Sequence, residues 1–285
     1  MALRARLYSA LHAFLFPSPR PKIRYRDPLP NVVFDNKLLN GKTVLITGAG
    51  KNIGRAVAIE MAKQGATILF TDIDSERCSL LTSELKKIPA KTEGFISDVA
   101  NAEHVASLIA TLHAKNYVID VLVNNVGIRS HNDPFEAFDI EDWRNTFQTN
   151  LFGPLLLTKH IVEMMKSNSV SGSLIFISST HQWSVMKSAA YSSSKAAIGM
   201  VVHELALELA PFEIRVNGIA PGAVGMDDNG NLKSNRFAPL HRSAIPPEYI
   251  GRAAVFLASE FFSEYTTGTT MTVDAGLSLV NHLAG

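Results

Sequence analysis

From Lys42 onward, short apolar runs alternate with longer segments of helical periodicity, and this alternation leaves few folds open to the chain. The runs are rich in valine, isoleucine and leucine, as strands buried on both faces are. Strands linked by helices in this way form a parallel sheet that is covered on both sides. No linker follows residue 41, which predicts one α/β domain over 41–285. The predicted strands are 44–46, 67–70, 118–123, 174–177, 214–216 and 271–273, and the last three predicted helices span about 150–166, 189–209 and 247–259.

The composition suits a globular protein that binds a small molecule. The 285 residues are 46% hydrophobic and 19% charged, which leaves ample apolar material for a core. The net charge is +1, from 27 basic and 26 acidic residues, and it argues against nucleic acid as a partner. A single cysteine, Cys78, excludes an internal disulfide and fits a reducing compartment, so we expect a cytoplasmic protein. Nine scattered histidines without an H-E-x-x-H pattern indicate no metal site.

Residues 1–40 form a basic, proline-rich extension. No acidic residue precedes Asp27, and five of the thirteen prolines lie between Pro17 and Pro30. Leucine and phenylalanine recur at helical spacing over residues 1–16, which predicts a short amphipathic helix that ends at Pro17. Its apolar span is too short to cross a bilayer. Three interpretations remain: an arm packed on a second subunit or on its own domain, an interfacial membrane helix, and an organelle transit peptide.

A glycine-rich turn, 47–54 (TGAGKNIG), follows the first predicted strand, and a helical pattern begins at once. Glycines at such a turn let the backbone approach a pyrophosphate, whose charge is stabilised by the free amides of the helix N-terminus. Asp72 ends the second predicted strand, 18 residues after Gly54, where a carboxylate could accept hydrogen bonds from a ribose diol. A glycine-rich turn without a ligand is the alternative, but the strand-helix-strand context favours a dinucleotide.

Tyr191 and Lys195 lie four positions apart in a predicted helix, so their side chains share one face. A nearby ammonium favours the ionised form of a phenol and lowers its pKa, which suits the phenol for proton transfer. Taken alone, the pair is also common on solvated helix faces.

Five motifs in this order resemble the short-chain dehydrogenase/reductase family. The resemblance covers about residues 41–280. It implies a single Rossmann-type, doubly wound parallel sheet of about seven strands with helices on both faces, and hydride exchange with a nicotinamide cofactor. Counted by the seven strands of the family's sheet, the motifs are Gly-x-Gly-x-x-x-Gly in the turn, Asn124-Asn125-Val126-Gly127 after the fourth strand, Ile177-Ser178-Ser179 after the fifth, Tyr191 with Lys195, and Pro221-Gly222 after the sixth.

The resemblance implies four catalytic residues: Asn150, Ser179, Tyr191 and Lys195. Tyr191 would be the general acid/base, and Lys195 would lower its pKa and bind the nicotinamide ribose. Ser179 would hydrogen-bond the substrate oxygen, although the spacing to Tyr191 leaves Ser178 as an alternative and a serine here could merely cap the turn. Asn150 would hold a water near the lysine, or would cap a helix that begins there.

The resemblance also implies a cofactor cleft and no metal ligand. Asp98, after the third strand, would contact the adenine or would instead cap the next helix. Three positions depart from the family pattern: Asn52 replaces a glycine but tolerates positive φ, Val126 replaces an alanine, and Met226 replaces a threonine that often holds the carboxamide. The implied cofactor-binding residues are Gly48, Gly50, Lys51, Asn52, Ile53, Gly54, Asp72, Asp98, Val99, Asn124, Gly127, Tyr191, Lys195, Pro221, Gly222 and Val224.

Two residues point to different cofactors. Asp72 is typical of family members that use NAD, and its carboxylate would repel a 2′-phosphate. Lys51 stands where NADP-using members often carry a basic residue. We expect NAD, with NADP as the alternative.

The prediction is therefore an NAD(P)-dependent oxidoreductase that interconverts a secondary alcohol and a ketone. A catalytically silent nucleotide-binding regulatory or scaffold protein is the alternative, but such a protein has no chemical need for all four catalytic residues. Reduction of a 3-oxoacyl thioester is only a guess at the substrate, and sugar, polyol, steroid and hydroxy-acid chemistry stay open. The substrate pocket would depend on 222–246, a predicted mobile loop, and on residues near Gly127 and His181. Family members commonly pair the helices that contain Asn150 and Tyr191 with those of a second subunit, so we expect a homodimer or homotetramer. Peripheral membrane contact through residues 1–16 is a further expectation.

Overall fold

Seven strands form one parallel sheet in the order β3-β2-β1-β4-β5-β6-β7. This computed structural model describes residues 37–129, 136, 138–185, 187–225 and 232–280, so the predicted helix within 1–16 and Met226 lie outside the described residues. The chain runs outward from β1 to β3 and then returns to place β4 on the other side of β1. The strands are β1 (Thr43–Thr47), β2 (Thr67–Asp72), β3 (Thr92–Ile96), β4 (Val121–Asn124), β5 (Ser173–Ile177), β6 (Arg215–Pro221) and β7 (Thr270–Val273).

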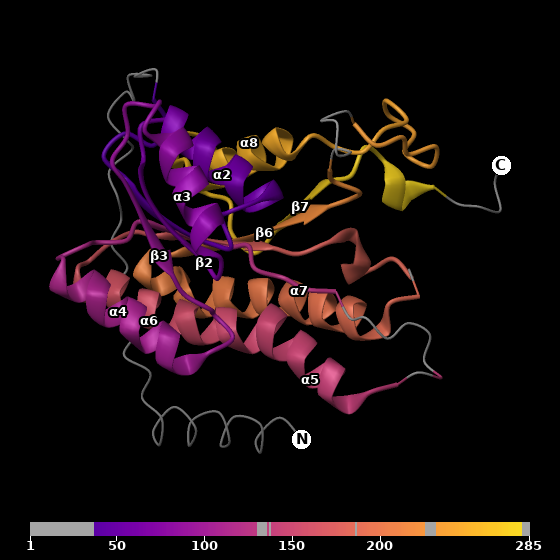
Figure 1. Ribbon diagram of the computed structural model, residues 1–285, viewed down its shortest axis with the longest axis horizontal. Helices are drawn as coiled ribbons and strands as arrows, with labels where there is room; N and C mark the ends of the chain where they lie inside the picture. Colours follow the sequence, from indigo (N-terminus) through magenta and orange to yellow (C-terminus); the bar gives the residue numbers. More distant parts are fainter. Residues whose placement is uncertain (1–36, 130–135, 137, 186, 226–231, 281–285) are drawn as a thin grey trace, which may run out of the picture. The chain divides into compact units, whose positions relative to one another are not determined.

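Helices cover both faces of this sheet, as Figure 1 shows, with α2, α3 and α8 on one face and α4, α5, α6 and α7 on the other. This is the doubly wound arrangement that the sequence predicts. The helices are α2 (Asn52–Lys63), α3 (Ser75–Leu85), α4 (Ala102–Ala114), α5 (Ile140–Phe147), α6 (Gly153–Ser167), α7 (Ala189–Leu209), α8 (Pro247–Ala258) and the short α9 (Glu260–Ser263).

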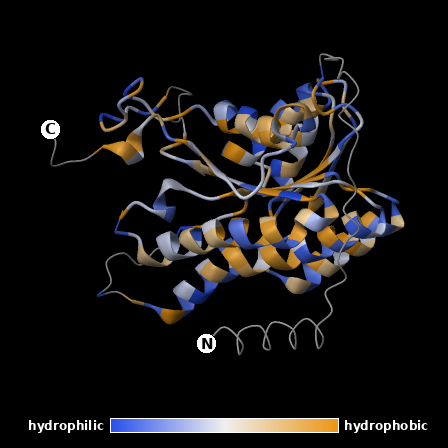
Figure 2. Ribbon diagram, turned by 180° about the vertical axis from the view of Figure 1, so that it is seen from behind, coloured by the Kyte–Doolittle hydropathy of each residue, from blue (hydrophilic) through white to orange (hydrophobic). Residues whose placement is uncertain are grey.

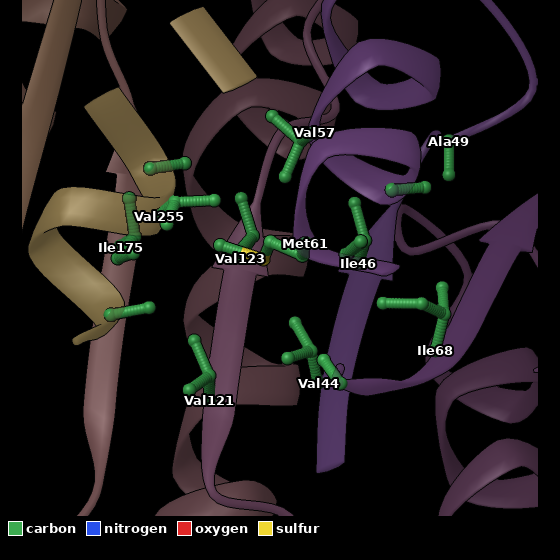
Figure 3. Close-up of a cluster of buried hydrophobic side chains, with 14 of the residues drawn as sticks. Val44, Ile46, Ala49, Val57, Met61, Ile68, Val121, Val123, Ile175 and Val255 are labelled. Carbon is green, nitrogen blue, oxygen red and sulfur yellow. The ribbon is translucent and has the colours of Figure 1, made fainter. Parts of the chain in front are cut away.

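The core has two layers because each strand points alternate side chains to opposite faces. Ile46 and Val123 pack with Met61 of α2 and Val255 of α8 on one face, as Figure 3 shows. Leu45 and its neighbours on the same strands pack against α4, α6 and α7 on the other. Apolar residues follow the strands and the sheet-facing sides of the helices in Figure 2. The sheet is thus held rigidly from both sides.

The helix starts reflect local chemistry. Asp74, Asn101 and Asp139 each precede a helix and accept hydrogen bonds from its first amides, which satisfies donors that have no partner within the helix. The start predicted at about residue 150 is wrong, because α5 begins at Ile140 and continues through a π-helical turn, Gln148–Phe152, into α6. Asn150 therefore lies inside a continuous helix and does not cap one.

Strand boundaries also differ from the prediction. Strand β4 begins at Val121, since the Asp120 carboxylate turns back to accept a hydrogen bond from the Thr43 amide, 2.8 Å away. Strand β6 extends to Pro221, beyond its apolar start, because it pairs with β5 on one side and β7 on the other. The edge strand β3 lacks an apolar run, and one of its polar residues, Glu93, bonds the Tyr117 hydroxyl at 2.8 Å.

Candidate functional site

A cavity of about 590 Å³ lies at the carboxyl ends of the central strands. The strand order reverses between β1 and β4, and in open α/β sheets ligands bind at such a switch point. The cavity reaches from Asp72 at the end of β2, past the glycine-rich turn, to Tyr191 and Lys195 on α7. Its extent and place fit a dinucleotide.

The glycine-rich turn has the backbone that a phosphate site requires. Gly48 has a φ of +60°, which favours glycine, and Asn52 has a φ of +46°, as its tolerance of positive φ predicts. A Cβ on Gly54 would lie 2.3 Å from the Gly48 carbonyl oxygen, so α2 can approach the turn this closely only with glycine there. No side chain caps α2, which leaves its first amides available to an anion.

Asp72 is buried at the end of β2 and its carboxylate is well supported. It accepts hydrogen bonds from the Gly50 amide at 2.9 Å and from the Asp74 amide at 3.1 Å. Arg77, on the first turn of α3, lies 3.7 Å from the same carboxylate and lines the cavity. Both charges therefore meet at the place where the adenosine ribose is expected. The sequence analysis missed Arg77, although its place one turn after a strand end was a signal.

Tyr191 and Lys195 share one face of α7, as predicted. The Lys195 Nζ lies 5.6 Å from the Tyr191 ring centre and donates a hydrogen bond to the Ile177 carbonyl oxygen at 2.9 Å. Burial lowers the pKa of Lys195 to about 8. Burial also raises the pKa of Tyr191, against the opposing effects of a hydrogen bond with Ser179 and the charge of Arg129. The net direction for Tyr191 is upward because desolvation of the phenol outweighs these opposing effects, and Lys195 is not among the groups that lower this pKa, so its effect on the phenol stays a prediction.

The two serines after β5 have different surroundings. The Ser178 Oγ lies 2.8 Å from the Gln182 Oε1 and 3.2 Å from the Lys195 carbonyl oxygen, so its single hydroxyl hydrogen is directed to acceptors within the protein although Ser178 also lines the first cavity. The Ser179 hydroxyl accepts a hydrogen bond from the His181 amide at 3.2 Å and also acts to lower the pKa of Tyr191. Ser179 thus caps a short turn and faces the phenol at the same time.

Asn150 is buried away from the cavity. Its side chain bonds the backbone of Ile128 and, through Nδ2, the Ser194 Oγ at 3.0 Å. A Cβ on Gly127 would lie 3.6 Å from the Asn150 Oδ1 and 3.2 Å from the Lys195 Nζ. Asn150 therefore lies close to Gly127 and Lys195, which line the cavity, but does not line it itself.

Most of the predicted cofactor residues line the cavity, but two do not. Gly50 is turned toward Asp72, and Asn124 is buried in β4 with its Nδ2 bonded to the Thr158 hydroxyl at 2.9 Å. The expectation that Asn124 lines the cleft is wrong, because its side chain points to α6. The predicted residues that line the cavity are Gly48, Lys51, Asn52, Ile53, Gly54, Asp72, Asp98, Val99, Gly127, Tyr191, Lys195, Pro221, Gly222 and Val224, with Ser179 beside them. The residues that the prediction missed include Ile73, Arg77, Ser97, Asn125, Ile128, Asn145 and Thr149.

The hydrogen bonds of Asp98 and Asn125 show what each side chain does in the site. Asp98 lines the cavity and accepts a hydrogen bond from the Ala100 amide at 2.9 Å, whereas Asn101 caps the next helix. The alternative that Asp98 caps α4 is therefore wrong. Asn125, which the prediction left out, donates to the carbonyl oxygens of Thr47 and Gly48 at 3.0 and 2.9 Å. It fastens the glycine-rich turn to the end of β4.

A second cavity of about 390 Å³ adjoins the first at Ser179 and Tyr191. Its lining includes Arg129, His181 and Leu277. The His181 ring meets the Tyr191 ring edge to face, with ring centres 5.0 Å apart. Tyr191 therefore lines both cavities. Hydride transfer between a cofactor in one cavity and a substrate in the other needs such a shared boundary.

The described residues contain no cluster of three or more side chains that could hold a metal ion. Within the same part of the chain, no helix is long and apolar enough to span a membrane.

Comparisons with known proteins agree with this geometry. The family model for enoyl-(acyl carrier protein) reductase matches residues 48–278. Glucose 1-dehydrogenase 2 of Bacillus subtilis (strain 168) is 32% identical over 251 residues, which cover 85% of this chain and 97% of that protein. The 7alpha-hydroxysteroid dehydrogenase of Escherichia coli (strain K12) is 30% identical over 249 residues, covering 85% and 96%. A solved 7alpha-hydroxysteroid dehydrogenase, in complex with NADH and 7-oxo glycochenodeoxycholic acid, superposes with a TM-score of 0.77 at 29% identity, over 86% of this chain and 98% of that one. The chain belongs to the short-chain dehydrogenase/reductase family and is an oxidoreductase that acts on CH-OH groups with a nicotinamide cofactor.

Proposed function

We propose that Tyr191 is the general acid/base of an alcohol/ketone oxidoreduction at the junction of the two cavities. The supporting observation is that Tyr191 and Ser179 line both cavities, with the Ser179 hydroxyl near enough to oppose the rise in the pKa of Tyr191. The nicotinamide cofactor supplies the hydride in reduction and accepts it in oxidation. Tyr191 gives its proton to the carbonyl oxygen in one direction and takes the hydroxyl proton in the other, while Ser179 hydrogen-bonds that oxygen.

Lys195 in the cavity lining and Asn150 behind it complete this proposal. The buried Lys195 ammonium, held by the Ile177 carbonyl, is placed to bind a ribose hydroxyl and to favour the ionised phenol once both are close. Asn150 fixes the segment at Gly127 and Ile128 that separates the two cavities. In this proposal the proton is handled by Tyr191 and Lys195 of α7 and by Ser179 after β5.

In this proposal, two parts of the first cavity hold the adenosine half of the cofactor. The uncapped α2 amides would hold the pyrophosphate, and Asp72 would accept hydrogen bonds from the adenosine ribose. Because the Asp72 carboxylate is fixed by the Gly50 amide, it would keep a 2′-phosphate away, and NAD is the proposed cofactor. Steady-state kinetics test the choice, since a higher kcat/KM with NADP(H) than with NAD(H) would contradict it.

A catalytically silent protein of the same fold is the competing function. Both interpretations predict binding of the dinucleotide, but only the enzyme changes its redox state. The experiment is a search for cofactor reduction with a panel of sugars, polyols, steroids, hydroxy acids and 3-hydroxyacyl thioesters. Turnover of any of these above the rate without protein supports the enzyme, and dinucleotide binding without turnover of the whole panel favours the silent protein. The panel includes thioesters because the matching family model carries the name of an acyl carrier protein reductase.

Assembly, domain organisation and location stay proposals. One catalytic domain over 41–285 is supported by the compact grouping of residues 33–285. Association into a homodimer or homotetramer is supported by apolar side chains that stay exposed on the helical layer, including Phe152, Met200 and Leu207. A cytoplasmic location rests on the single cysteine, which is buried.

A further inference from the structure

A positive charge that the proposed reaction does not use lines the second cavity. Arg129 lines this cavity together with Ser179, Tyr191 and His181, and no Asp or Glu occurs among the described lining residues. The remaining lining is small or apolar, with Ile128, Ala223 and Leu277 among its members. A guanidinium at neutral pH is always charged and offers only hydrogen-bond donors.

The structure orients this guanidinium and leaves part of it available. Its Nε donates a hydrogen bond to the Ser188 Oγ at 3.3 Å, and Ser188 is buried at the start of α7, three residues before Tyr191. That is its one polar contact with the described residues. The two terminal nitrogens of the guanidinium can therefore bind a planar or tetrahedral anion with two parallel hydrogen bonds.

Arg129 also acts on the reacting end of the cavity. Its charge opposes the burial that raises the pKa of Tyr191, so the phenol lies within the field of the guanidinium. An anion that binds Arg129 would neutralise this field and would lie in the same cavity as the phenol and Ser179. The second cavity thus has a cation, Arg129, in one part of its lining and a proton donor, Tyr191, in another.

We propose that the substrate of this enzyme carries an anionic group, a carboxylate or a phosphate, which binds the Arg129 guanidinium while its alcohol or ketone carbon faces Tyr191 and Ser179. This inference rests on the proposed function, since it uses the same cavity and the same acid/base. A neutral polyol would leave the charge of Arg129 without a counterion among the described lining residues. A carboxylate or phosphate satisfies both the charge and the donors.

The first test compares acids with their uncharged analogues. We measure kcat/KM for 3-hydroxybutanoate and lactate, for their methyl esters, and for glycerol 3-phosphate and glycerol, in the wild type, Arg129→Gln and Arg252→Gln. Arg252 on α8 lines neither cavity and pairs with Glu60 at 3.6 Å, so its variant controls for the loss of one positive charge. The ratio of anionic to neutral substrate within one variant cancels any effect of Arg129 on the Tyr191 pKa.

The wild type is expected to favour at least one anionic substrate over its neutral partner. Arg129→Gln should lower that ratio about 10-fold to 100-fold, as loss of a charge-assisted contact does, whereas Arg252→Gln should leave it unchanged. Carboxylates and phosphates form separate arms, and the arm with the larger loss identifies the group. Equal loss for charged and neutral substrates in Arg129→Gln would overturn the inference.

A binding measurement separates failure of this inference from failure of the proposed function. Acetoacetate, methyl acetoacetate and dihydroxyacetone phosphate are titrated by calorimetry into Tyr191→Phe and into the double variant with Arg129→Gln, both with NADH present. Tighter binding of an anionic compound that disappears in the double variant supports the anion site even where no substrate turns over. Turnover of neutral substrates, together with equal affinities for the anionic compounds in Tyr191→Phe and in the double variant, would overturn the anion site and leave the proposed oxidoreductase function intact.

Discussion

The side-chain amide of Asn150 holds the backbone of Ile128 by two hydrogen bonds: the Ile128 amide donates to Oδ1 at 2.8 Å, and Nδ2 donates to the Ile128 carbonyl oxygen at 2.9 Å. This pair fixes the segment that follows β4 and separates the two cavities. Arg129 is the next residue along the chain. Asn150 therefore positions both the wall of the cofactor cleft and the proposed anion site without lining either cavity.

Asn150→Ala should weaken both the fold and the site. The change removes three hydrogen bonds at a buried position and leaves backbone groups of Ile128 without their partners, which costs about 1 to 3 kcal/mol of unfolding free energy. The measurement is urea unfolding together with kcat/KM. An unfolding free energy equal to that of the wild type would show that the pair does not hold the segment.

Lys195→Met should stabilise the protein near neutral pH. Lys195 has a folded pKa of about 8 against an ordinary value of 10.5, so the folded state binds fewer protons between these values and the wild type gains stability as pH rises through them. At about pH 7 the buried charge costs up to about 3 kcal/mol, which the loss of the hydrogen bond to Ile177 partly offsets.

The expected net gain for Lys195→Met is about 1 to 2 kcal/mol at about pH 7, and it should shrink as the pH approaches about 10. Urea unfolding of both proteins across this range measures it. A variant that is less stable than the wild type at neutral pH, with a difference in unfolding free energy that does not change with pH, would contradict the lowered pKa.

The two reaction directions should depend on pH in opposite senses. The raised pKa of Tyr191 keeps the phenol protonated at neutral pH, which suits donation to a carbonyl, whereas oxidation of an alcohol needs the ionised phenol. We expect kcat/KM for oxidation to rise steadily from about pH 7 to about pH 9 and kcat/KM for reduction to stay level or fall. Oxidation that does not change over this range would show that a different group, or a differently tuned phenol, accepts the proton.

Cofactor preference should respond to the charges at the end of β2. Asp72→Asn removes the negative charge beside the expected ribose while Arg77 stays, so the ratio of kcat/KM for NADP to that for NAD should rise about 10-fold or more. Arg77→Gln in the same background should reverse much of this gain, because the guanidinium is then missing. A ratio unchanged in Asp72→Asn would place the 2′ position elsewhere.

The sequence predicted the fold better than its boundaries. Alternating apolar runs identified the parallel sheet, since buried parallel strands need such runs, but β3 escaped the list of runs because an edge strand tolerates polar residues such as Glu93. The helix start predicted at about residue 150 is wrong, because α5 is polar and continues through a π-helical turn into α6. Local patterns do not reveal such a continuation.

The candidate site shows the same division. The glycines of the turn, Asp72 and the Tyr191–Lys195 spacing are local signals, and the structure places all of them except Gly50 in the lining of one cavity. The pKa of Tyr191 could not be predicted, because it depends on burial by elements distant in sequence. Arg129 and Arg77 lacked a motif, and their importance follows from the cavities that they line.

The central claim is that Tyr191 transfers the proton during oxidoreduction, and one comparison tests it most directly. Reduced nicotinamide is followed by absorbance with the best substrate of the panel, for the wild type, Tyr191→Phe and Tyr265→Phe. Tyr265 is almost fully exposed and lines neither cavity, so its variant is a matched loss of one phenol hydroxyl. The account predicts that Tyr191→Phe lowers kcat about 10²-fold to 10⁴-fold with dinucleotide binding intact, while Tyr265→Phe changes neither. Equal turnover in all three proteins would contradict it.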